Sequence, residues 1–234
     1  MLRKVAKKVF IAEILKGKFV PADVEAKRSA YVITSLGEKV SRVNLVGTVI
    51  DKFEGNNFIE LKLDDGSGSI KVRAFDNFEK LREIEIGDLV NVIGKVREFN
   101  DEIYINVEIL RKVNFAVEIF RKLEICERIL ERKPIVDEIR RIAKTTDEMV
   151  AIEFAKEKYG FEPEVTKQIL TPQKIDYAEK IFELIKNLEG ENGIELSEIF
   201  EISDLPENVI EKALNELLEE GKIYEPQPGK FKTV

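Results

Sequence analysis

The sequence has 234 residues, 44% of them apolar and 35% charged, which is the composition of a globular protein rather than a disordered one. Its one cysteine and lack of histidine exclude an internal disulfide, leave no plausible zinc site and remove the commonest general acid or base. No apolar run approaches the roughly 20 residues of a membrane span, and the N-terminus lacks the apolar core of a signal peptide. We therefore expect a cytoplasmic protein, with about two domains for this length.

Charge is distributed unevenly along a chain whose net charge is −7. Residues 1–40 carry a balance of +5, residues 41–112 of −3, residues 113–173 of −1 and residues 174–234 of −8. Affinity for nucleic acid depends largely on Lys and Arg side chains that neutralise phosphates. The C-terminal part is therefore a poor candidate for contact with DNA or RNA. Abundant charge with scarce Cys, His and Met is typical of thermostable proteins.

Residues 1–40 are predicted to form an extension that packs on the domain that follows. The run from Arg3 to Lys8 is rich in lysine and is expected on the solvated face of a helix whose Val5, Val9 and Ala12 point inward. The alternative interpretation is a path for nucleic acid along Arg3, Lys4, Lys7, Lys8, Lys16 and Lys18. Residues 31–34 are a candidate additional strand for the same domain.

Residues 41–112 are predicted to form a small closed β-barrel. Segments of alternating apolar residues indicate strands at 41–51, 58–64, 69–75, 89–99 and 102–109. Residues 77–85 interrupt this alternation, since Phe78, Leu81 and Ile84 recur at helical spacing. Five strands with a helix between the third and the fourth is the order of an OB-fold, whose second and third strands bind oligonucleotides or oligosaccharides. Gly47 and Gly94 are expected to allow bulges or sharp coiling.

The outward faces of strands 2 to 5 combine cations with aromatic rings, because the alternation directs the aliphatic residues into the barrel. Aromatic faces stack on bases while cations follow the backbone, so this combination predicts binding of a single strand. The alternative is an ordinary solvated face, on which a phenylalanine covers the barrel end or contacts a partner subunit. Acidic residues are expected mainly in the turns and the helical segment. The candidate nucleic-acid-binding residues are Phe58, Lys62, Lys71, Arg73, Phe75, Lys95, Arg97, Phe99 and Tyr104.

Residues 113–159 are predicted to be a helical assembly segment. A first helix is expected at 114–132, capped by Asn114 and stopped before Pro134. Its apolar residues recur at coiled-coil intervals and favour partner helices over packing on the barrel. This candidate subunit interface comprises Ala116, Ile119, Leu123, Cys126 and Leu130, with Cys126 as a small core residue rather than a reactive thiol. A second helical stretch, 135–159, is broken near Thr146, and residues 160–173 are predicted to be a linker.

Residues 174–234 follow the order helix, short helix, longer helix and hairpin, which predicts a winged helix-turn-helix. Pro206 is expected to open the third helix and Gly221 to end it. This would-be recognition helix exposes four glutamates, at positions 207, 211, 216 and 219, and these would repel phosphates. We therefore predict a protein-interaction domain.

Catalysis is not supported by any group of residues in the sequence. Phosphate-binding glycine motifs are missing, and Asp64 and Asp65 beside Gly66 are typical turn formers rather than metal ligands. We expect no catalytic residue, no cofactor and no metal.

The order of an OB barrel, a helix, a linker and a winged helix resembles the middle subunit of replication protein A. The N-terminal half is similar to the archaeal replication protein A-associated family in residues 3–13 (RKVAKKVFIAE), 31–43 (YVITSLGEKVSRV) and 46–49 (VGTV). The resemblance implies a heterotrimer with other OB-fold subunits, in which the helix after the barrel joins a three-helix bundle. It also implies that the winged helix docks replication or repair proteins and that the protein is nucleoid-associated.

The leading hypothesis is a non-catalytic subunit that helps to bind and protect single-stranded DNA in replication, repair and recombination. One alternative is a structural OB scaffold that assembles partners without contacting DNA, which the weak net charge of the barrel favours. Another is an RNA-binding OB protein.

Overall fold

The computed structural model describes residues 5–23, 25, 27–55, 57–75, 79–171, 177–190, 193–203 and 205–234. The chain divides into two compact units, Met1–Gln173 and Lys174–Val234. The predictions that concern Arg3, Lys4, Phe78 and residues 172–176 lie outside the described residues.

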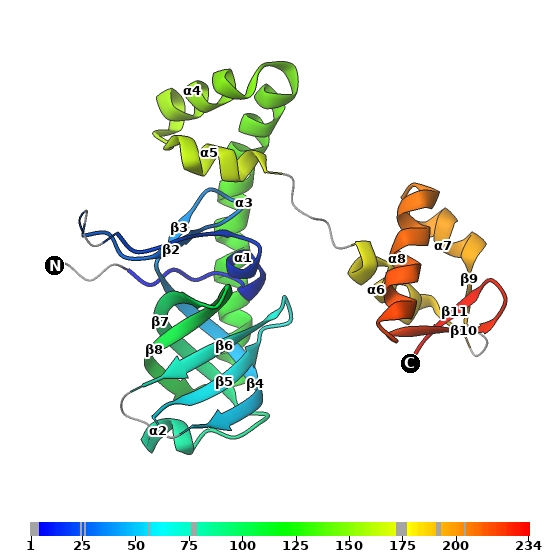
Figure 1. The fold of residues 1–234 in the computed structure, drawn as a ribbon, viewed down its shortest axis with the longest axis horizontal. Coiled ribbons are helices and arrows are strands. Elements are labelled where there is room, and N and C mark those ends of the chain that lie inside the picture. Colours follow the sequence, from blue (N-terminus) through cyan, green and yellow to red (C-terminus); the bar gives the residue numbers. More distant parts are fainter. Residues whose placement is uncertain are drawn as a thin grey trace. The chain divides into compact units, whose positions relative to one another are not determined.

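A closed five-stranded barrel forms one end of the first unit, and the OB-fold prediction is confirmed (Figure 1). Its strands are β4 (Arg42–Glu54), β5 (Ile59–Asp64), β6 (Ser69–Ala74), β7 (Leu89–Phe99) and β8 (Glu102–Lys112), and α2 (Glu79–Arg82) lies between β6 and β7 in the chain. The order around the barrel is β4-β5-β6-β8-β7, with β6 and β8 parallel and the other pairs antiparallel. The barrel is therefore of mixed type.

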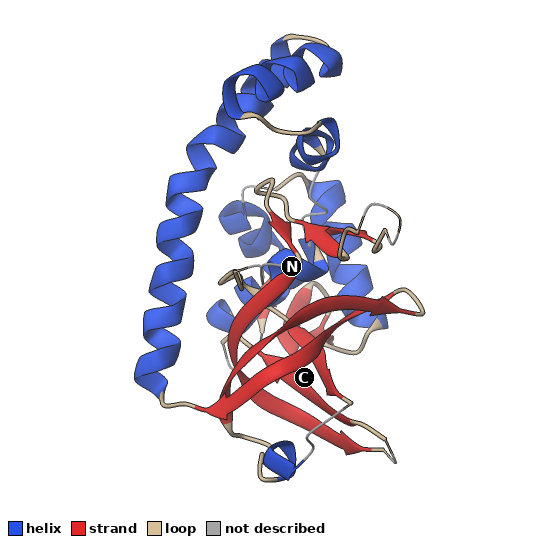
Figure 2. Cartoon of the chain, turned by 90° about the vertical axis from the view of Figure 1, so that its left-hand side faces the viewer, coloured by secondary structure: helices blue, strands red, loops and turns tan. Residues whose placement is uncertain are grey.

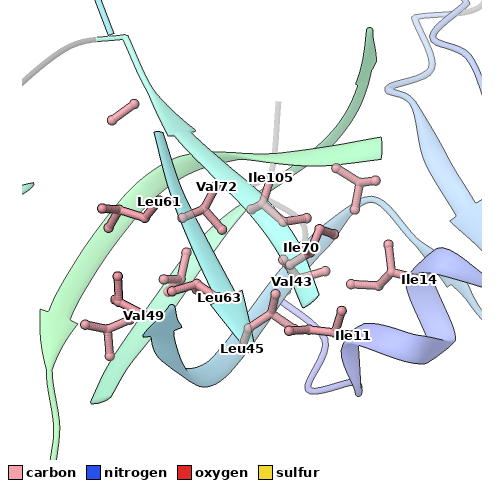
Figure 3. Packing of buried hydrophobic residues seen from close by; sticks show 14 of the residues in the cluster. Ile11, Ile14, Val43, Leu45, Val49, Leu61, Leu63, Ile70, Val72 and Ile105 are labelled. Carbon is pink, nitrogen blue, oxygen red and sulfur yellow. The ribbon is translucent and has the colours of Figure 1, made fainter. Parts of the chain in front are cut away.

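The barrel interior is filled by the aliphatic residues that the alternation directs inward. Leu61 and Leu63 of β5 and Val72 of β6 are fully buried. Figure 3 shows Ile11 and Ile14 of α1 (Ile11–Leu15) beside this cluster, so the short helix extends the core at one end of the barrel. Gly94 lies where a side chain cannot fit, since a Cβ there would come within 2.5 Å of the Asn106 carbonyl oxygen. The pairing of β7 with β8 shifts register at this point, which agrees with the first of the two alternatives predicted for Gly94, a bulge or sharp coiling.

The N-terminal extension differs from the predicted amphipathic helix. Residues 5–10 are not helical: Lys7 forms a bridge with Val43, and Val5 is exposed while Val9 is buried. Extended backbone alternates its side chains, so the lysine-rich run does not share one helical face. Strands β1 (Lys18–Val20), β2 (Tyr31–Ile33) and β3 (Lys39–Val40) form a separate three-stranded sheet, so residues 31–34 do not join the barrel.

Helix α3 (Phe115–Thr145) begins as predicted, with the Asn114 side chain accepting a hydrogen bond from the Val117 N–H at 3.2 Å. The predicted stop before Pro134 is wrong, because the helix continues for eleven residues beyond it. Pro134 is exposed, and the turns after it are held by buried Val136 and Ile139. Tertiary burial thus outweighs the lost backbone hydrogen bond of the proline.

Two further helices pack on the end of α3, which extends past the barrel (Figure 2). They are α4 (Glu148–Tyr159) and α5 (Pro163–Leu170), and Thr146 ends α3 while Asp147 precedes α4. The predicted linker at 160–173 therefore contains a helix. Val165 and Ile169 of α5 are buried against Tyr31 and Ile33. This burial of apolar surface offsets the conformational entropy lost when a segment that contains glycine and proline becomes ordered.

The second unit has the winged-helix arrangement. It contains α6 (Tyr177–Leu188), β9 (Ile194–Glu195), α7 (Leu196–Ser203), α8 (Glu207–Glu219), β10 (Ile223–Gln227) and β11 (Lys230–Thr233), with the sheet order β10-β11-β9. Ile181, Ile185 and Leu217 are among its fully buried residues. Pro206 is the N-cap of α8 rather than its first helical residue, and Gly221 follows the helix with a positive φ of 68°.

Candidate nucleic-acid interface

A row of polar side chains crosses four neighbouring strands on the outward face of the barrel. The strand register aligns Lys62 of β5 with Lys71 of β6, Lys71 with Tyr104 of β8, and Tyr104 with Arg97 of β7. These residues are far apart in the sequence, but residues in register on adjacent strands lie side by side. The row therefore places three cations and one aromatic ring on a common line.

A second row runs beside the first. It aligns Glu60 of β5, Arg73 of β6, Asn106 of β8, Lys95 of β7 and Arg42 of β4. The Arg73 guanidinium lies 4.6 Å from the centroid of the Tyr104 ring and so links the two rows by a cation–π contact.

Aromatic rings gather at one end of this face. The centroid of the Phe58 ring lies 5.9 Å from that of Phe53 and 6.2 Å from that of Phe75. Phe53 is 57% exposed and Phe75 is 46% exposed, while Phe58 lies half-buried between them. Exposed rings at such spacing provide stacking surfaces for bases.

Phe53 is not among the interface residues predicted from the sequence, because the first strand was predicted to end at Asp51. The pairing of β4 with β5 shifts between Val49 and Asp51, and the strand then continues to Glu54. A bulge adds one residue and reverses the alternation beyond it. Counting from Val49 with this extra residue would have placed Phe53 on the outward face.

The cations of the face are largely paired with carboxylates, contrary to the expectation that acidic residues lie mainly in turns and in the helical segment. Glu102 Oε1 lies 2.7 Å from Lys71 Nζ, and Glu102 Oε2 lies 3.7 Å from Arg73 Nη2. Glu60 Oε2 lies 2.5 Å from Arg73 Nε. A phosphate that binds here must displace these carboxylates.

The remaining predicted cations have different surroundings. Lys95 Nζ is 3.6 Å from Glu108 Oε1, whereas the Arg97 guanidinium donates a hydrogen bond to the Val96 carbonyl at 3.0 Å. Among the described residues, no carboxylate forms a salt bridge with Arg97 or Lys62. These two residues are the most available cations of the first row.

A groove of about 430 Å³ continues the face toward α1 and the turn between β7 and β8. Phe99 is exposed next to this turn, in which Asn100 and Asp101 both have positive φ. The hairpin thus presents Phe99 near the edge of the groove. The residues lining the groove include Leu15, Lys62, Ser69, Lys71, Glu102 and Ile103.

The predicted interface residues of α3 all lie on its exposed side. Ala116, Ile119, Leu123, Cys126 and Leu130 are exposed, so Cys126 is not a core residue of this chain. Phe115 and Phe120 add exposed rings beside them. We call these seven residues the α3 seam.

Charged residues hold the opposite side of α3 to the rest of the unit. The Arg121 guanidinium donates to the Asn44 carbonyl oxygen at 2.6 Å, and Arg132 donates to the carbonyl oxygens of Leu36 and Gly37 at 3.0 Å. Arg128 forms ion pairs with Glu13 and Glu38. The helix is therefore attached through these polar contacts together with buried Ile125, Val136 and Ile139, and its apolar seam is left outward.

The winged-helix unit presents an acidic surface on α8. Ile210, Ala213, Leu214 and Leu217 are buried, while the glutamates at 207, 211, 216 and 219 are exposed. Exposed carboxylates along the helix that would enter a DNA groove repel phosphates.

The acidic turn between β5 and β6 is a hydrogen-bonded cap rather than a free cluster of ligands. Asp65 accepts hydrogen bonds from the N–H groups of Ile11 and Ser67 at 2.8 and 2.9 Å, and Asp64 accepts one from the Gly66 N–H at 2.7 Å. Within the described ranges, no three His, Cys, Asp or Glu residues are grouped so that they could hold a metal ion. None of the helices described is long and apolar enough to cross a bilayer.

Two parts of the chain match known domain families. Residues 43–113 match the OB-fold nucleic acid binding domain, and residues 146–227 match the replication protein A C terminal domain. The whole chain is 34% identical over 234 residues to a protein of Methanocaldococcus jannaschii named Uncharacterized protein MJ1654, and the alignment covers 88% of that protein. The chain therefore belongs to the same family as the Methanocaldococcus jannaschii protein, a replication protein A-like family with an OB-fold and a C-terminal winged helix.

More distant relatives share parts of this architecture. Replication factor A protein 2 of Schizosaccharomyces pombe is 29% identical over 105 residues, which are 45% of this chain and 35% of that protein. A structure titled as a replication protein A heterotrimer bound to ssDNA is 22% identical, with a TM-score of 0.47 over 55% of this chain and 98% of that chain. Members of the replication protein A-like family combine an OB-fold nucleic-acid-binding domain with a C-terminal winged helix, and they are generally non-catalytic.

Proposed function

We propose that this protein is a non-catalytic subunit of a heterotrimeric replication protein A-like complex that binds and protects single-stranded DNA in replication, repair and recombination. The observation that carries the proposal is the outward face of the barrel, where the Lys62–Lys71–Tyr104–Arg97 row lies on the same sheet as the Phe53–Phe58–Phe75 cluster.

The geometry of this face suits a flexible strand with accessible bases. The exposed rings of Phe53, Phe75 and Phe99 offer stacking surfaces that accept any base, and the cations lie between them along the strand register. The curved outer surface of the closed barrel favours a strand over a small molecule, which binds best in a deep apolar pocket. Direct contact of Phe58, Lys62, Lys71, Arg73, Phe75, Lys95, Arg97, Phe99 and Tyr104 with DNA is part of this proposal.

Assembly with other OB-fold subunits is supported by the α3 seam. Leu123 is 62% exposed and Leu130 is 69% exposed on a helix whose other side is already attached to its own unit. Coiled-coil spacing of such residues fits partner helices that also present an apolar stripe. The acidic α8 of the winged helix supports docking of replication or repair proteins that carry basic segments.

Two substitutions, one on the barrel face and one on the α3 seam, test the two surfaces, and each is the control for the other. Phe75→Ala removes one exposed ring from the barrel, and we expect affinity for an oligothymidine to fall at least about fivefold, since stacking contributes roughly 1 to 3 kcal/mol per base. Phe115→Ala removes a more exposed ring, on α3, and should leave DNA affinity unchanged while weakening co-purification of the partner subunits. Fluorescence polarisation and affinity purification from the native cell measure these effects. Equal DNA affinity for Phe75→Ala and the wild type would refute the proposed role of the face.

A scaffold subunit that leaves DNA to its partners is the second candidate function. It is favoured by the carboxylates of Glu60, Glu102 and Glu108, which already neutralise cations of the face. A protein that co-purifies with two other OB-fold subunits but binds neither DNA nor RNA alone would select this function. Preference for an RNA competitor over DNA would instead indicate an RNA-binding protein.

A further inference from the structure

A pocket of about 420 Å³ lies in the N-terminal extension, between the segment around Lys7 and the β1-β2-β3 sheet. Its described lining is Val5, Lys7, Arg28, Tyr31, Lys39 and Ser41. Three of these six residues are cations and none is acidic. We call it the basic pocket.

The cations of the basic pocket come from different segments, and two of them converge on one ring. The Arg28 guanidinium carbon is 5.7 Å from the centroid of Tyr31, and Lys39 Nζ is 5.3 Å from the same centroid. Tyr31 itself is only 3% exposed, so its ring is covered and is not available to stack on a base. The accessible chemistry of the pocket is therefore positive charge rather than aromatic surface.

The carboxylates near these cations leave them available to a ligand. Lys39 pairs with Glu162 and Arg28 with Asp23, but these carboxylates are 64% and 41% exposed, and exposed pairs contribute little. Glu38 is shared between Lys7 and Arg128. Burial lowers the pKa of Lys7, and the nearby charges of Arg132 and Arg128 lower it further, against the opposing effect of Glu13. Because Lys7 shares Glu38 with Arg128, its positive charge is only partly compensated by that carboxylate.

The basic pocket begins next to the barrel face. Ser41 lines the pocket, and the following residue, Arg42, ends the second row of the face beside Lys95. A guanidinium and two ammonium groups around a small cavity match the several oxygens of a phosphate group. We propose that the basic pocket holds a backbone phosphate of the same single strand after it leaves the barrel face, an inference that rests on the proposed function.

Oligothymidines of two lengths distinguish DNA binding at the basic pocket from DNA binding at the barrel face. An oligothymidine of about 8 nucleotides occupies the face alone, whereas one of about 20 also reaches the pocket, given site sizes of about 4 to 16 nucleotides per OB-fold. In the full chain, Arg28→Ala/Lys39→Ala should weaken binding of the longer oligomer by roughly three- to tenfold and leave the shorter one unchanged. The slope of log affinity against log salt should become shallower by about 0.7 for each phosphate that the variant no longer neutralises.

Matched variants keep the test decisive. Lys144→Ala/Lys156→Ala removes two cations of the same unit that do not line the pocket, and it should bind both oligomers as the wild type does. Ser41→Glu keeps all three pocket cations but adds a carboxylate, and it should also weaken binding of the longer oligomer. It replaces the double variant in the test if a thermal melt shows that the double variant is unstable.

The outcomes distinguish this inference from the proposed function. Wild-type binding of both oligomers by the pocket variants would overturn the inference alone, as would an equal decrease in affinity for both lengths. Failure of the wild type to bind either oligomer would refute the proposed function and the inference with it.

Discussion

Glu102→Gln is expected to tighten binding of single-stranded DNA. Glu102 contacts both Lys71 and Arg73, at 2.7 and 3.7 Å, and its side chain is 46% exposed. Partly exposed pairs contribute about 0.2 to 1 kcal/mol each, so removing the two pairs of Glu102, while Arg73 keeps its pair with Glu60, should improve binding by about 0.4 to 2 kcal/mol, or roughly two- to thirtyfold. One additional phosphate contact would steepen the salt dependence by about 0.7. The free energy of unfolding should fall by no more than about 2 kcal/mol, because only these two weak pairs are removed.

Fluorescence polarisation with oligothymidine at several salt concentrations measures both quantities. Glu98→Gln is the matched control, since it removes the same charge from the same hairpin, and Glu98 forms no salt bridge with the described residues. Unchanged or weaker binding by Glu102→Gln would refute the reasoning. Equal tightening by both variants would show that total charge, and not release of the β6 cations, controls the affinity.

Three other substitutions test the assembly surface, the barrel and a surface ion pair. Leu123→Glu should abolish co-purification of partner subunits without changing the melting temperature; unimpaired assembly would exclude the α3 seam. Gly94→Ala should destabilise the protein by roughly 1 to 3 kcal/mol, because its Cβ would clash with backbone, and Gly68→Ala, with its nearest atom at 3.5 Å, should not. Hydrogen bonds from Lys158 and Tyr159 lower the pKa of Glu138 below its ordinary value, so these contacts stabilise the fold above that ordinary value and their contribution is lost as pH falls through the lowered pKa. Glu138→Gln should therefore flatten the decline in melting temperature on acidification, and an unaltered pH profile would contradict this assignment.

The barrel and its inward residues could be predicted from the sequence because they follow from local alternation. In β5, Ile59, Leu61 and Leu63 alternate with polar residues, so only one face of the strand can point into a core, and all three residues are buried. Asn114 was also predictable as a cap, since its role involves only residues of the same turn.

The errors of prediction have nonlocal causes. Helix α3 passes Pro134 because later residues of the helix are buried against segments more than a hundred positions away in the chain, such as Tyr31 and Ile33. The same cluster orders α5 within the predicted linker. Short motifs do not reveal such burial, so a proline or glycine alone indicates a break that the complete fold overrides.

The composition of the candidate interface could be predicted only in part. Alternation placed Lys71 and Arg73 outward, but their neutralisation by Glu102 depends on the parallel pairing of β6 with β8, which crosses about thirty residues. Phe53 was hidden by a bulge in β4. The direction of a side chain is thus encoded locally, whereas its charge environment depends on topology.

The attachment of α3 to its own unit has a consequence for the proposed assembly. Arg121, Arg128 and Arg132 fix the helix to its own unit in the chain without a partner. An incoming helix therefore meets a surface that is already ordered, and the loss of conformational entropy on association is confined to side chains and to the partner. Docking should resemble rigid-body recognition, with a heat-capacity change that reflects only the apolar area of the seam and no component from coupled folding of this chain.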